Sequence, residues 1–420
     1  MKNKDNKQNS KILINGSYSI LLTVLLLAGL IIVNLIVNHL PVKVTQFDFS
    51  NAKLYTLTDT TTGILKNLDQ DVELYYICEG GKEDDTIQKL LDRYESASSH
   101  IKVEQIDPAL YPGFTSKYTQ EDVANNSVIA VSGDVSKVVN ADSMYVESMN
   151  YNTYSYVKTG FDGEGMITSA VDYVTAKDIP NLYILSGNGE TALGSAFGDV
   201  ISKDNVNPLT LNLMTTDKVP EDADAILINT PTVDYSEEEA QKIIDYLEDG
   251  GKAIIFSNYT VEDMPNFDSI LANYGVEREK GIILEGDSDK YMSYQYCLVP
   301  DISYSAITEN VYGNGSVLAP MSQGILTSDS HRDSITYQPL LTTSDASYSK
   351  EDVENMTTSE KEKGDKSGPF TIGMLIQEDT NNDDEADTEI VYYSTGYLLE
   401  SNYNQAVSGI IKYIIKKHTA

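Results

Sequence analysis

An uncharged stretch near the N-terminus, Tyr18–Val37, constrains this chain more than any other feature. It consists mostly of Leu, Ile and Val, and Asn34 carries its only amide side chain. A helix of this length rises about 30 Å, the thickness of the hydrocarbon layer of a bilayer. Four lysines and one aspartate precede the stretch, and positively charged flanks stay cytoplasmic. The stretch predicts a single transmembrane anchor, with residues 1–17 in the cytoplasm and the body of the chain outside the cell membrane.

The same stretch could instead be a cleaved signal peptide, a lipoprotein signal or a buried core helix. A signal peptide has a shorter apolar core and a small-x-small cleavage site, and residues 37–41 offer no such site. In a lipoprotein signal a cysteine would follow Ala28-Gly29, but position 30 is Leu. An uncharged stretch of this length so near the N-terminus favours an uncleaved anchor over a core helix.

The rest of the chain is strongly acidic. The whole sequence holds 30 Lys and Arg against 64 Asp and Glu. Without the four lysines and one aspartate of the first eleven residues, 26 basic and 63 acidic residues remain, a net charge of −37. Such a charge repels nucleic acid and anionic lipid headgroups, which excludes nucleic-acid binding. Two cysteines, Cys78 and Cys297, are too few for a disulfide framework and are expected to be separate buried thiols.

Residues 54–160 are predicted to form a thioredoxin-like α/β domain, after a linker over residues 38–53. Val72–Cys78 and Ile101–Ile106 have the composition of strands. Between them, Thr86–Ser96 carries an i, i+3, i+4, i+7 apolar stripe that predicts a helix. Strand, helix and strand make a βαβ unit. Glu-Gly-Gly follows Cys78, so the Cys-x-x-Cys of a redox domain is missing and no redox chemistry is expected.

Residues 161–413 are predicted to form a second, doubly wound α/β domain, followed by a basic tail at 414–420. Three apolar runs are typical of buried parallel strands: 181–185, 225–228 and 253–256. Ser236 and Glu239 have the spacing of a capping box at the start of a helix. Strands that alternate with helices indicate a doubly wound sheet, and its last strand is expected at Ile390–Tyr393.

Four stretches resemble the Gldg family, the auxiliary component of ABC-type transport systems named for gliding motility. They are KLYTLTDTTTGILKNLDQDVELYY (53–76), FDGEGMITSAVDYVTAKDIPNLYILSGNGE (161–190), DAILINTPTVDYSEEEAQKIIDYLEDGGKAIIF (224–256) and PLLTTSDASYSK (339–350). Together they span about residues 50–413. The resemblance implies a class I glutamine-amidotransferase-like fold for the second domain, and a permease and an ATPase of an ABC transporter as partners. Members of the family read Gly-His-Gly-Glu where this chain has Gly187-Asn188-Gly189-Glu190, and the lost imidazole weakens any proton-transfer role.

The residues needed for amidotransferase chemistry are not in place. That chemistry requires a cysteine at a strand-to-helix turn, near a histidine and an acid, but Ser257-Asn258 follows the strand at 253–256. Ser257 could form a triad with His331 and a carboxylate, which leaves a divergent hydrolase as an alternative. A nucleophile elbow has Gly on both sides of the serine, and Phe256 and Asn258 stand there. The chain is therefore predicted to be neither an enzyme nor, since it lacks a P-loop motif, the transporter's ATPase. No cofactor is expected.

An acidic loop at 378–389 imitates a calcium-binding loop. Asp379, Asn381 and Asp383 alternate as calcium ligands do. Asp384 stands where an EF-hand loop has Gly, and Ile390 stands where it has Glu. A solvated hairpin tip is the default interpretation, with calcium binding as the alternative.

A docking site is expected at the carboxyl edge of the second domain's strands, where open α/β sheets bind ligands. The candidate residues are Gly187, Asn188, Gly189, Glu190, Thr230, Ser257 and Asn258. Alternatively, the glycines only form a turn and Glu190 only caps a helix. If docking is their role, replacing Asn188 and Glu190 with Ala should leave the melting temperature nearly unchanged and weaken partner binding.

The sequence thus predicts a membrane-anchored, extracytoplasmic, non-catalytic accessory subunit of an ABC transporter. The alternative is a cell-surface binding module for a sugar or a peptide. Its candidate surface is a Tyr-rich face around Tyr145, Tyr151, Tyr154 and Tyr156, because aromatic rings stack on sugars.

Overall fold

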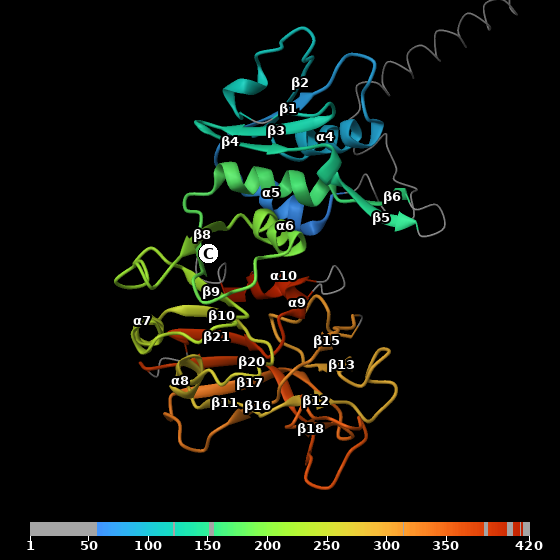
Figure 1. The fold of residues 1–420 in the computed structure, drawn as a ribbon. Coiled ribbons are helices and arrows are strands. Elements are labelled where there is room, and N and C mark those ends of the chain that lie inside the picture. Colours follow the sequence, from blue (N-terminus) through green and yellow to red (C-terminus); the bar gives the residue numbers. More distant parts are fainter. Residues whose placement is uncertain are drawn as a thin grey trace, which may run out of the picture. The chain divides into compact units, whose positions relative to one another are not determined.

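The computed structural model describes residues 57–120, 122–150, 155–313, 315–381, 385–400, 406–411 and 413–414 (Figure 1). The chain divides into two compact units between Thr175 and Ala176. The predicted anchor, Tyr18–Val37, lies outside the described residues. Among the residues that are described, none forms a helix long and apolar enough to span a bilayer.

The first unit is built on a four-stranded sheet with the order β2-β1-β3-β4. Its strands are β1 (Val72–Ile77), β2 (Ile101–Ile106), β3 (Ser127–Ser132) and β4 (Val135–Val139). β1 and β2 are parallel and joined by helix α4 (Asp85–Ala97), which confirms the predicted βαβ unit. β3 is antiparallel to β1 and to β4. The thioredoxin-like assignment of this unit stays a prediction.

Helices α3 (Asp59–Lys66) and α5 (Gly163–Thr175) belong to the same unit as α4. α5 buries Ile167 and Val171 in one hydrophobic cluster with Leu74 of β1. The expected domain boundary at residues 160 and 161 would have placed α5 in the second domain. The structure corrects this, because the apolar face of α5 completes the core of the first unit. The remaining elements here are η1 (Thr115–Lys117), η2 (Asp142–Met144) and a separate hairpin of β5 (Tyr145–Asn150) and β6 (Ser155–Phe161).

The second unit contains a ten-stranded mixed sheet. Five neighbouring strands are parallel, in the order β8-β7-β9-β10-β21. They are β7 (Asn181–Leu185), β8 (Asn207–Leu211), β9 (Ala225–Asn229), β10 (Lys252–Phe256) and β21 (Thr388–Tyr393). This part matches the predicted parallel sheet. β21 is the last strand in sequence and lies in the interior of the sheet, between β10 and β20.

The other half of this sheet is antiparallel, which the doubly wound prediction did not include. Its strands are β11 (Val276–Arg278), β14 (Asp301–Ile302), β16 (Ile325–Thr327), β17 (Ile335–Thr342) and β20 (Thr371–Glu378). β20 runs against β21, to which the acidic loop connects it directly. A direct connection between neighbouring strands makes them antiparallel, whereas parallel strands need a long crossover. The sheet is therefore parallel only up to β21.

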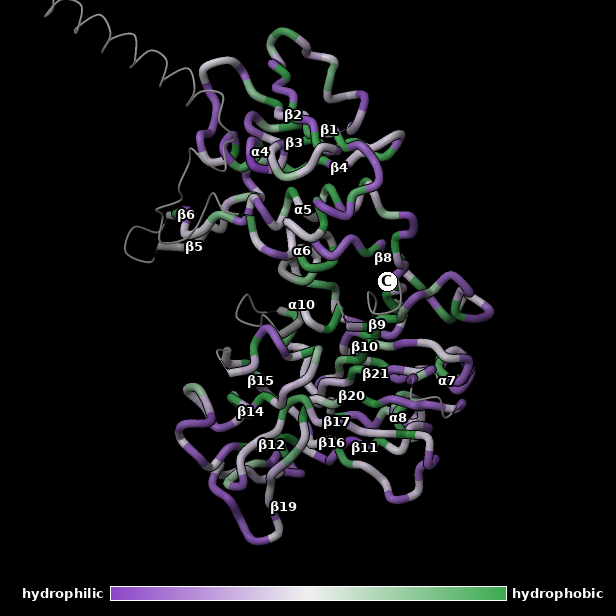
Figure 2. The backbone as a smooth tube through the Cα atoms, turned by 180° about the vertical axis from the view of Figure 1, so that it is seen from behind, coloured by the Kyte–Doolittle hydropathy of each residue, from purple (hydrophilic) through white to green (hydrophobic). Residues whose placement is uncertain are grey.

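Helices cover both faces of the parallel strands, as Figure 1 shows. Helices α6 (Ser195–Lys203), α9 (Tyr397–Glu400) and α10 (Ala406–Ile411) share one hydrophobic cluster with Leu227 and Ile254. Helices α7 (Glu237–Glu248) and α8 (Pro265–Ala272) share the other with Ile228 and Ile255. Successive strand residues thus point to opposite faces, and both faces are buried. Figure 2 shows hydrophobic residues concentrated along these central strands.

Two small sheets complete the second unit. One holds β12 (Ile282–Leu284), β18 (Tyr348–Lys350) and β19 (Lys366–Ser367), and the other holds β13 (Cys297–Leu298) and β15 (Ala319–Pro320). Cys78 at the end of β1 is buried and Cys297 is half-buried, and both thiols are free. This agrees with the prediction of two separate thiols, although Cys297 is less buried than expected.

Candidate functional site

The turns that follow β7, β9, β10 and β21 meet at the carboxyl edge of the parallel strands. Backbone hydrogen bonds join neighbouring turns: Thr191 N to Asn229 O at 2.9 Å, Thr230 N to Phe256 O at 2.9 Å, and Ser257 N to Tyr393 O at 3.1 Å. The structure therefore brings the seven predicted docking residues to one edge of the sheet. The turn after β8 joins them, because Asn212 contacts Gly187. We call residues 186–191, 212–214, 230–233, 257–261 and 394–397 the carboxyl edge.

Asn188 is only 2% exposed, and its polar groups bond within the protein. Its backbone N–H donates to Glu190 Oε2 at 2.7 Å, and its side-chain amide donates to Glu239 Oε1 at 3.2 Å. Its carbonyl accepts from the backbone N–H groups of Thr232 and Val233. Asn188 thus positions the turns after β7 and β9 and does not offer its side chain to a partner. From these contacts we expect the removal of Asn188 to lower stability, whereas the sequence analysis expected a nearly unchanged melting temperature when Asn188 and Glu190 are both replaced with Ala.

Glu239 and Tyr235 extend the same network into the start of α7. Glu239 accepts at 2.9 Å from the backbone N–H of Ser236, which confirms the predicted capping box. Burial opposes the ionisation of Glu239, but hydrogen bonds from Ser236 and Asn188 outweigh it and hold the pKa below its usual value. Burial, and secondly the charge of Glu190, raise the pKa of Tyr235, so its hydroxyl stays protonated and donates to Glu190 Oε1 at 3.0 Å.

Gly189 and Thr230 hold backbone conformations that fix the shape of the edge. Gly189 has φ of +72°, and a Cβ there would lie 2.2 Å from Thr232 Oγ1. That hydroxyl donates to the carbonyl of Gly189 at 3.0 Å. Thr230 has φ of +48°, which is unusual for a β-branched residue and costs on the order of 1–3 kcal/mol. Its hydroxyl donates to Thr191 Oγ1 at 2.7 Å, so both neighbouring turns restrain it.

Asn258 links the turn after β10 to the turn after β21. Its Oδ1 accepts from the backbone N–H of Gly396 at 2.8 Å. A Cβ on Gly396 would lie 2.2 Å from Thr230 Cγ2, so the turns after β9 and β21 are in direct contact. Three turns therefore form one closely packed unit.

Ser257 and His331 have different partners. Ser257 is buried, and its Oγ lies 2.8 Å from the hydroxyl of Tyr392. His331 Nδ1 lies 2.9 Å from the carbonyl oxygen of Arg332, and its ring packs edge-on against Tyr337. These contacts do not assemble the serine–histidine pair that a hydrolase requires.

The acidic loop has the contacts of a hairpin tip where it is described. Asp387 accepts from the backbone N–H of Thr380 at 2.8 Å and from the side-chain amide of Asn381 at 2.9 Å. Asp383 and Asp384 lie outside the described residues. Within the described part of the chain, no group of three or more His, Cys, Asp and Glu residues could hold a metal ion. The hairpin tip stays the default interpretation of this loop, and calcium binding stays the alternative.

The tyrosines of the alternative sugar or peptide surface are only partly described. The hydroxyl of Tyr145 donates to Asp84 Oδ2 at 2.6 Å, and its ring packs on Phe161 at 5.1 Å. Tyr145 thus contributes to the first unit's own structure. Tyr151 and Tyr154 lie outside the described residues, and Tyr156 lies on β6.

Sequence reasoning missed a set of exposed apolar residues at the carboxyl edge. One follows each of β8, β9, β10 and β21 within a few residues: Met214, Val233, Val261 and Tyr397. Their exposed fractions are 58%, 59%, 61% and 44%. We call these four side chains the apolar rim. The sequence did contain a signal that could have identified these residues: each lies as an apolar residue in a polar loop that follows a strand.

Two family models match parts of the chain. Residues 51–145 match a domain of unknown function (DUF7088), and residues 180–413 match a family described as an ABC-type uncharacterized transport system. No curated protein matches the chain.

Several solved structures have a distant likeness to the chain. The mmIFT52 N-terminal domain is 12% identical, with a TM-score of 0.41 over 57% of this chain and 97% of that chain. PurLQS from Thermotoga maritima is 13% identical, with a TM-score of 0.33 over 58% of this chain and 100% of that chain. A glutamine amidotransferase from Methylobacillus flagellatus is 11% identical, with a TM-score of 0.25 over 39% of this chain and 61% of that chain.

No functional conclusion follows from TM-scores this low. The family match is different, because residues 180–413 are more than half of the chain. They also include every strand of the ten-stranded sheet and all turns of the carboxyl edge. The chain therefore belongs to the family of ABC-type uncharacterized transport systems, as an auxiliary component.

Proposed function

We propose that this chain is a non-catalytic accessory subunit of an ABC transporter that binds the permease through its carboxyl edge, with the ATPase held in the same complex by the permease. Its family membership supports a role in a transport system. The Gldg assignment, the thioredoxin-like first unit and the amidotransferase-like second unit are part of the same proposal.

The observation that carries the docking role is the contrast between a satisfied polar interior and an exposed apolar rim. Asn188, Thr230 and Ser257 are each 2% exposed, and their side chains bond to groups of the protein itself. The turns are therefore held in place before a partner arrives, which reduces the entropy lost on binding. When a partner covers the apolar rim, each Å² of apolar surface removed from water contributes about 25 cal/mol to the binding free energy. The four rim side chains follow four strands of one sheet at the same edge, and they provide the apolar surface that the proposed partner would cover.

The proposal places the body of the chain outside the cytoplasm, with Tyr18–Val37 as its anchor. The acidic composition supports this placement, because a body with a large negative net charge is repelled by anionic surfaces. An alkaline phosphatase fused behind Ala420 should be active if the body is extracytoplasmic. Activity only when the phosphatase is fused ahead of Met1, with residues 1–17 kept, would reverse the orientation.

Affinity purification tests the accessory role. The tagged full chain is extracted from its native membranes in a mild detergent, and the recovered proteins are identified by mass spectrometry. We expect a permease and an ATPase of one ABC transporter to be recovered together, in amounts close to that of the chain. Recovery of the chain without either component would contradict the proposal.

A further inference from the structure

The carboxyl edge contains a single charged residue, Glu190. The other residues of its five turns are all uncharged, and they include neither Asp, Lys, Arg nor His. A negative charge therefore stands alone among polar turns and the exposed apolar rim. The partner that covers this edge has to match that one charge.

Neutral donors hold the carboxylate of Glu190 in place. The backbone N–H of Asn188 donates to its Oε2 at 2.7 Å, and the hydroxyl of Tyr235 donates to its Oε1 at 3.0 Å. A carboxylate offers about four acceptor positions, so each oxygen can accept a further hydrogen bond. The side chain is half-buried and its orientation is fixed before a partner arrives. Glu190 is thus a preformed acceptor with its full negative charge.

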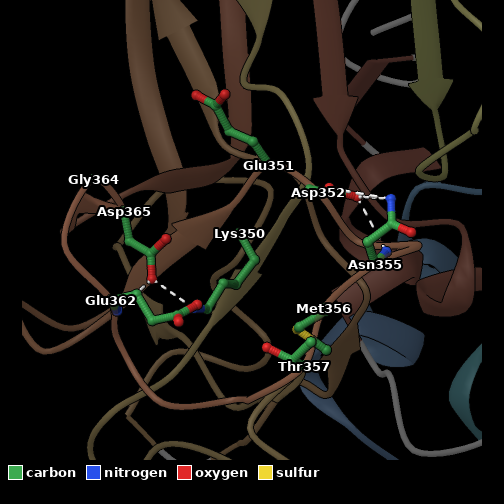
Figure 3. Close-up of a pocket in the computed structure, with 9 residues that line it drawn as sticks. All are labelled: Lys350, Glu351, Asp352, Asn355, Met356, Thr357, Glu362, Gly364 and Asp365. Atoms are coloured by element: carbon green, nitrogen blue, oxygen red, sulfur yellow. Dashed lines mark hydrogen bonds and ion pairs between the residues drawn. The ribbon is translucent and has the colours of Figure 1, made fainter.

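Other carboxylates of the second unit have a cation of the chain beside them. In the pocket next to β18 and β19, Lys350 Nζ lies 2.8 Å from Glu362 Oε2 and 2.8 Å from Asp365 Oδ2, as Figure 3 shows. Among the residues that the structure describes, Glu190 belongs to none of the ion pairs. The chain itself leaves the charge of Glu190 uncompensated.

The apolar rim begins directly beside this charge. The backbone N–H of Val233 donates to the carbonyl of Asn188 at 3.0 Å, so exposed Val233 and Glu190 belong to turns that are bonded to each other. A partner that covers Val233 therefore removes water from Glu190 as well. A carboxylate that loses water is destabilised unless a cation replaces the lost hydrogen bonds. Covering the rim thus favours a partner that brings a positive charge.

We propose that Glu190 accepts a hydrogen bond from a lysine or arginine of the permease, next to an apolar permease side chain that covers Val233. This inference rests on the proposed docking role of the carboxyl edge and adds the chemistry of the partner. The docking segment of the permease combines a cationic residue with an apolar one. An acidic segment is rejected, because like charges would be brought together as water leaves.

Co-purification of the permease with charge variants of the tagged full chain tests this pairing. Glu190→Gln keeps the size of the side chain and removes its charge, so recovery should fall about tenfold. Glu277→Gln is the matched control, because it removes the same charge from an exposed position on β11, the strand at the other end of the sheet order. Its recovery should equal that of the wild-type protein. The difference between wild type and E190Q should shrink as NaCl rises from about 0.05 to about 0.5 M.

A second variant leaves Glu190 and its hydrogen bonds unchanged, so it decides the matter even if E190Q does not fold. Ala192 is exposed and follows Glu190 closely in the sequence. Ala192→Lys places a positive charge of the chain itself near the carboxylate, which repels and replaces the cation of the permease. Recovery should fall severalfold in A192K and stay at the wild-type level in Ala192→Gln. Equal losses in A192K and A192Q, or in E190Q and E277Q, would overturn the pairing.

The triple rim variant V233S, V261S and Y397S separates this inference from the docking role. Wild-type recovery by E190Q and A192K together with a loss in the rim variant would refute the pairing and leave the docking role standing. Wild-type recovery by all three would refute both. Carbodiimide couples a carboxylate to a lysine amine and not to a guanidinium, so a cross-link from Glu190 to the permease, found by mass spectrometry, would identify a lysine. Losses in E190Q and A192K without that cross-link would identify an arginine.

Discussion

The side-chain amide of Asn188 donates to Glu239 Oε1 over 3.2 Å, and so joins the turn after β7 to the first turn of α7. Glu239 is 5% exposed, so its carboxylate depends on hydrogen bonds that the protein supplies. One amide therefore helps to hold the turn after β7 in place against the start of α7.

Replacing Asn188 with Ala should lower the free energy of unfolding by about 1–3 kcal/mol, because a buried carboxylate loses a donor. Urea unfolding followed by circular dichroism measures this change. Asn273→Ala is the matched control: its amide donates to Glu248 Oε1 at 3.1 Å on the surface, and its loss should cost less than about 0.5 kcal/mol. Equal stability of N188A and the wild-type protein would contradict this structural role and favour the docking role expected from the sequence.

Arg332 and Glu378 form a two-point ion pair at the end of β20. Arg332 Nε lies 2.6 Å from Glu378 Oε1, and Nη2 lies 2.8 Å from Oε2. The Glu378 side chain is 5% exposed and that of Arg332 is 40% exposed. Arg332→Gln should cost on the order of 2 kcal/mol, less than for a fully buried pair because water reaches the arginine. Lys218→Gln, which breaks an exposed pair with Glu221, should have no measurable effect.

The same pair predicts a pH dependence. Hydrogen bonds from Arg332 are the main reason why the pKa of Glu378 lies below its usual value. A carboxylate with a lowered folded-state pKa stabilises the protein above the unfolded-state pKa, about 4.3 for Glu, and loses this contribution as the pH falls through the folded-state value. The stability difference between wild-type protein and R332Q should therefore shrink from about pH 6 to about pH 3.5. A difference that stays constant over this interval would show that the pair is not the cause.

Gly396 packs its α-carbon against the turn after β9, and this close approach is testable. Gly396→Ala places a methyl group 2.2 Å from Thr230 Cγ2 and should cost about 1–3 kcal/mol through overpacking. Thr230→Ser removes that methyl group, so the double variant should recover part of the loss. Gly198→Ala in α6, where a Cβ meets nothing within 4 Å, should instead stabilise the protein by about 0.5–1 kcal/mol. Additive losses in the double variant would refute the contact between the two turns.

Much of the second unit could be predicted because its strands are buried on both faces. The apolar runs at β9 and β10 have no other stable environment, and both became parallel strands. The capping box of Ser236 and Glu239 was visible because it is local in sequence. In the antiparallel half, the hairpin around the acidic loop was predicted, and β20 and β21 form it. The rest of that half was not predicted, and β11, β14 and β16 have only two or three residues each and show no periodicity.

The site was predictable in position and not in role. The rule for open sheets located the edge, but the partner of Asn188 is 51 residues away, so nothing near Asn188 in the sequence indicates its burial. For α5 the sequence showed an apolar face without showing which core it completes. The apolar rim was overlooked because isolated apolar residues in loops are common on protein surfaces.

Quantitative co-purification of a rim variant tests the central claim most directly. Val233→Ser, Val261→Ser and Tyr397→Ser are combined in the tagged full chain, and the control combines Leu110→Ser, Tyr111→Ser and Val135→Ser, which are also exposed. Both proteins should keep the wild-type melting temperature, because exposed side chains contribute little to stability. The rim variant should recover the permease and the ATPase about tenfold less than wild type, and the control should recover them fully. Full recovery by the rim variant, or an equal loss in the control, would contradict docking through the carboxyl edge.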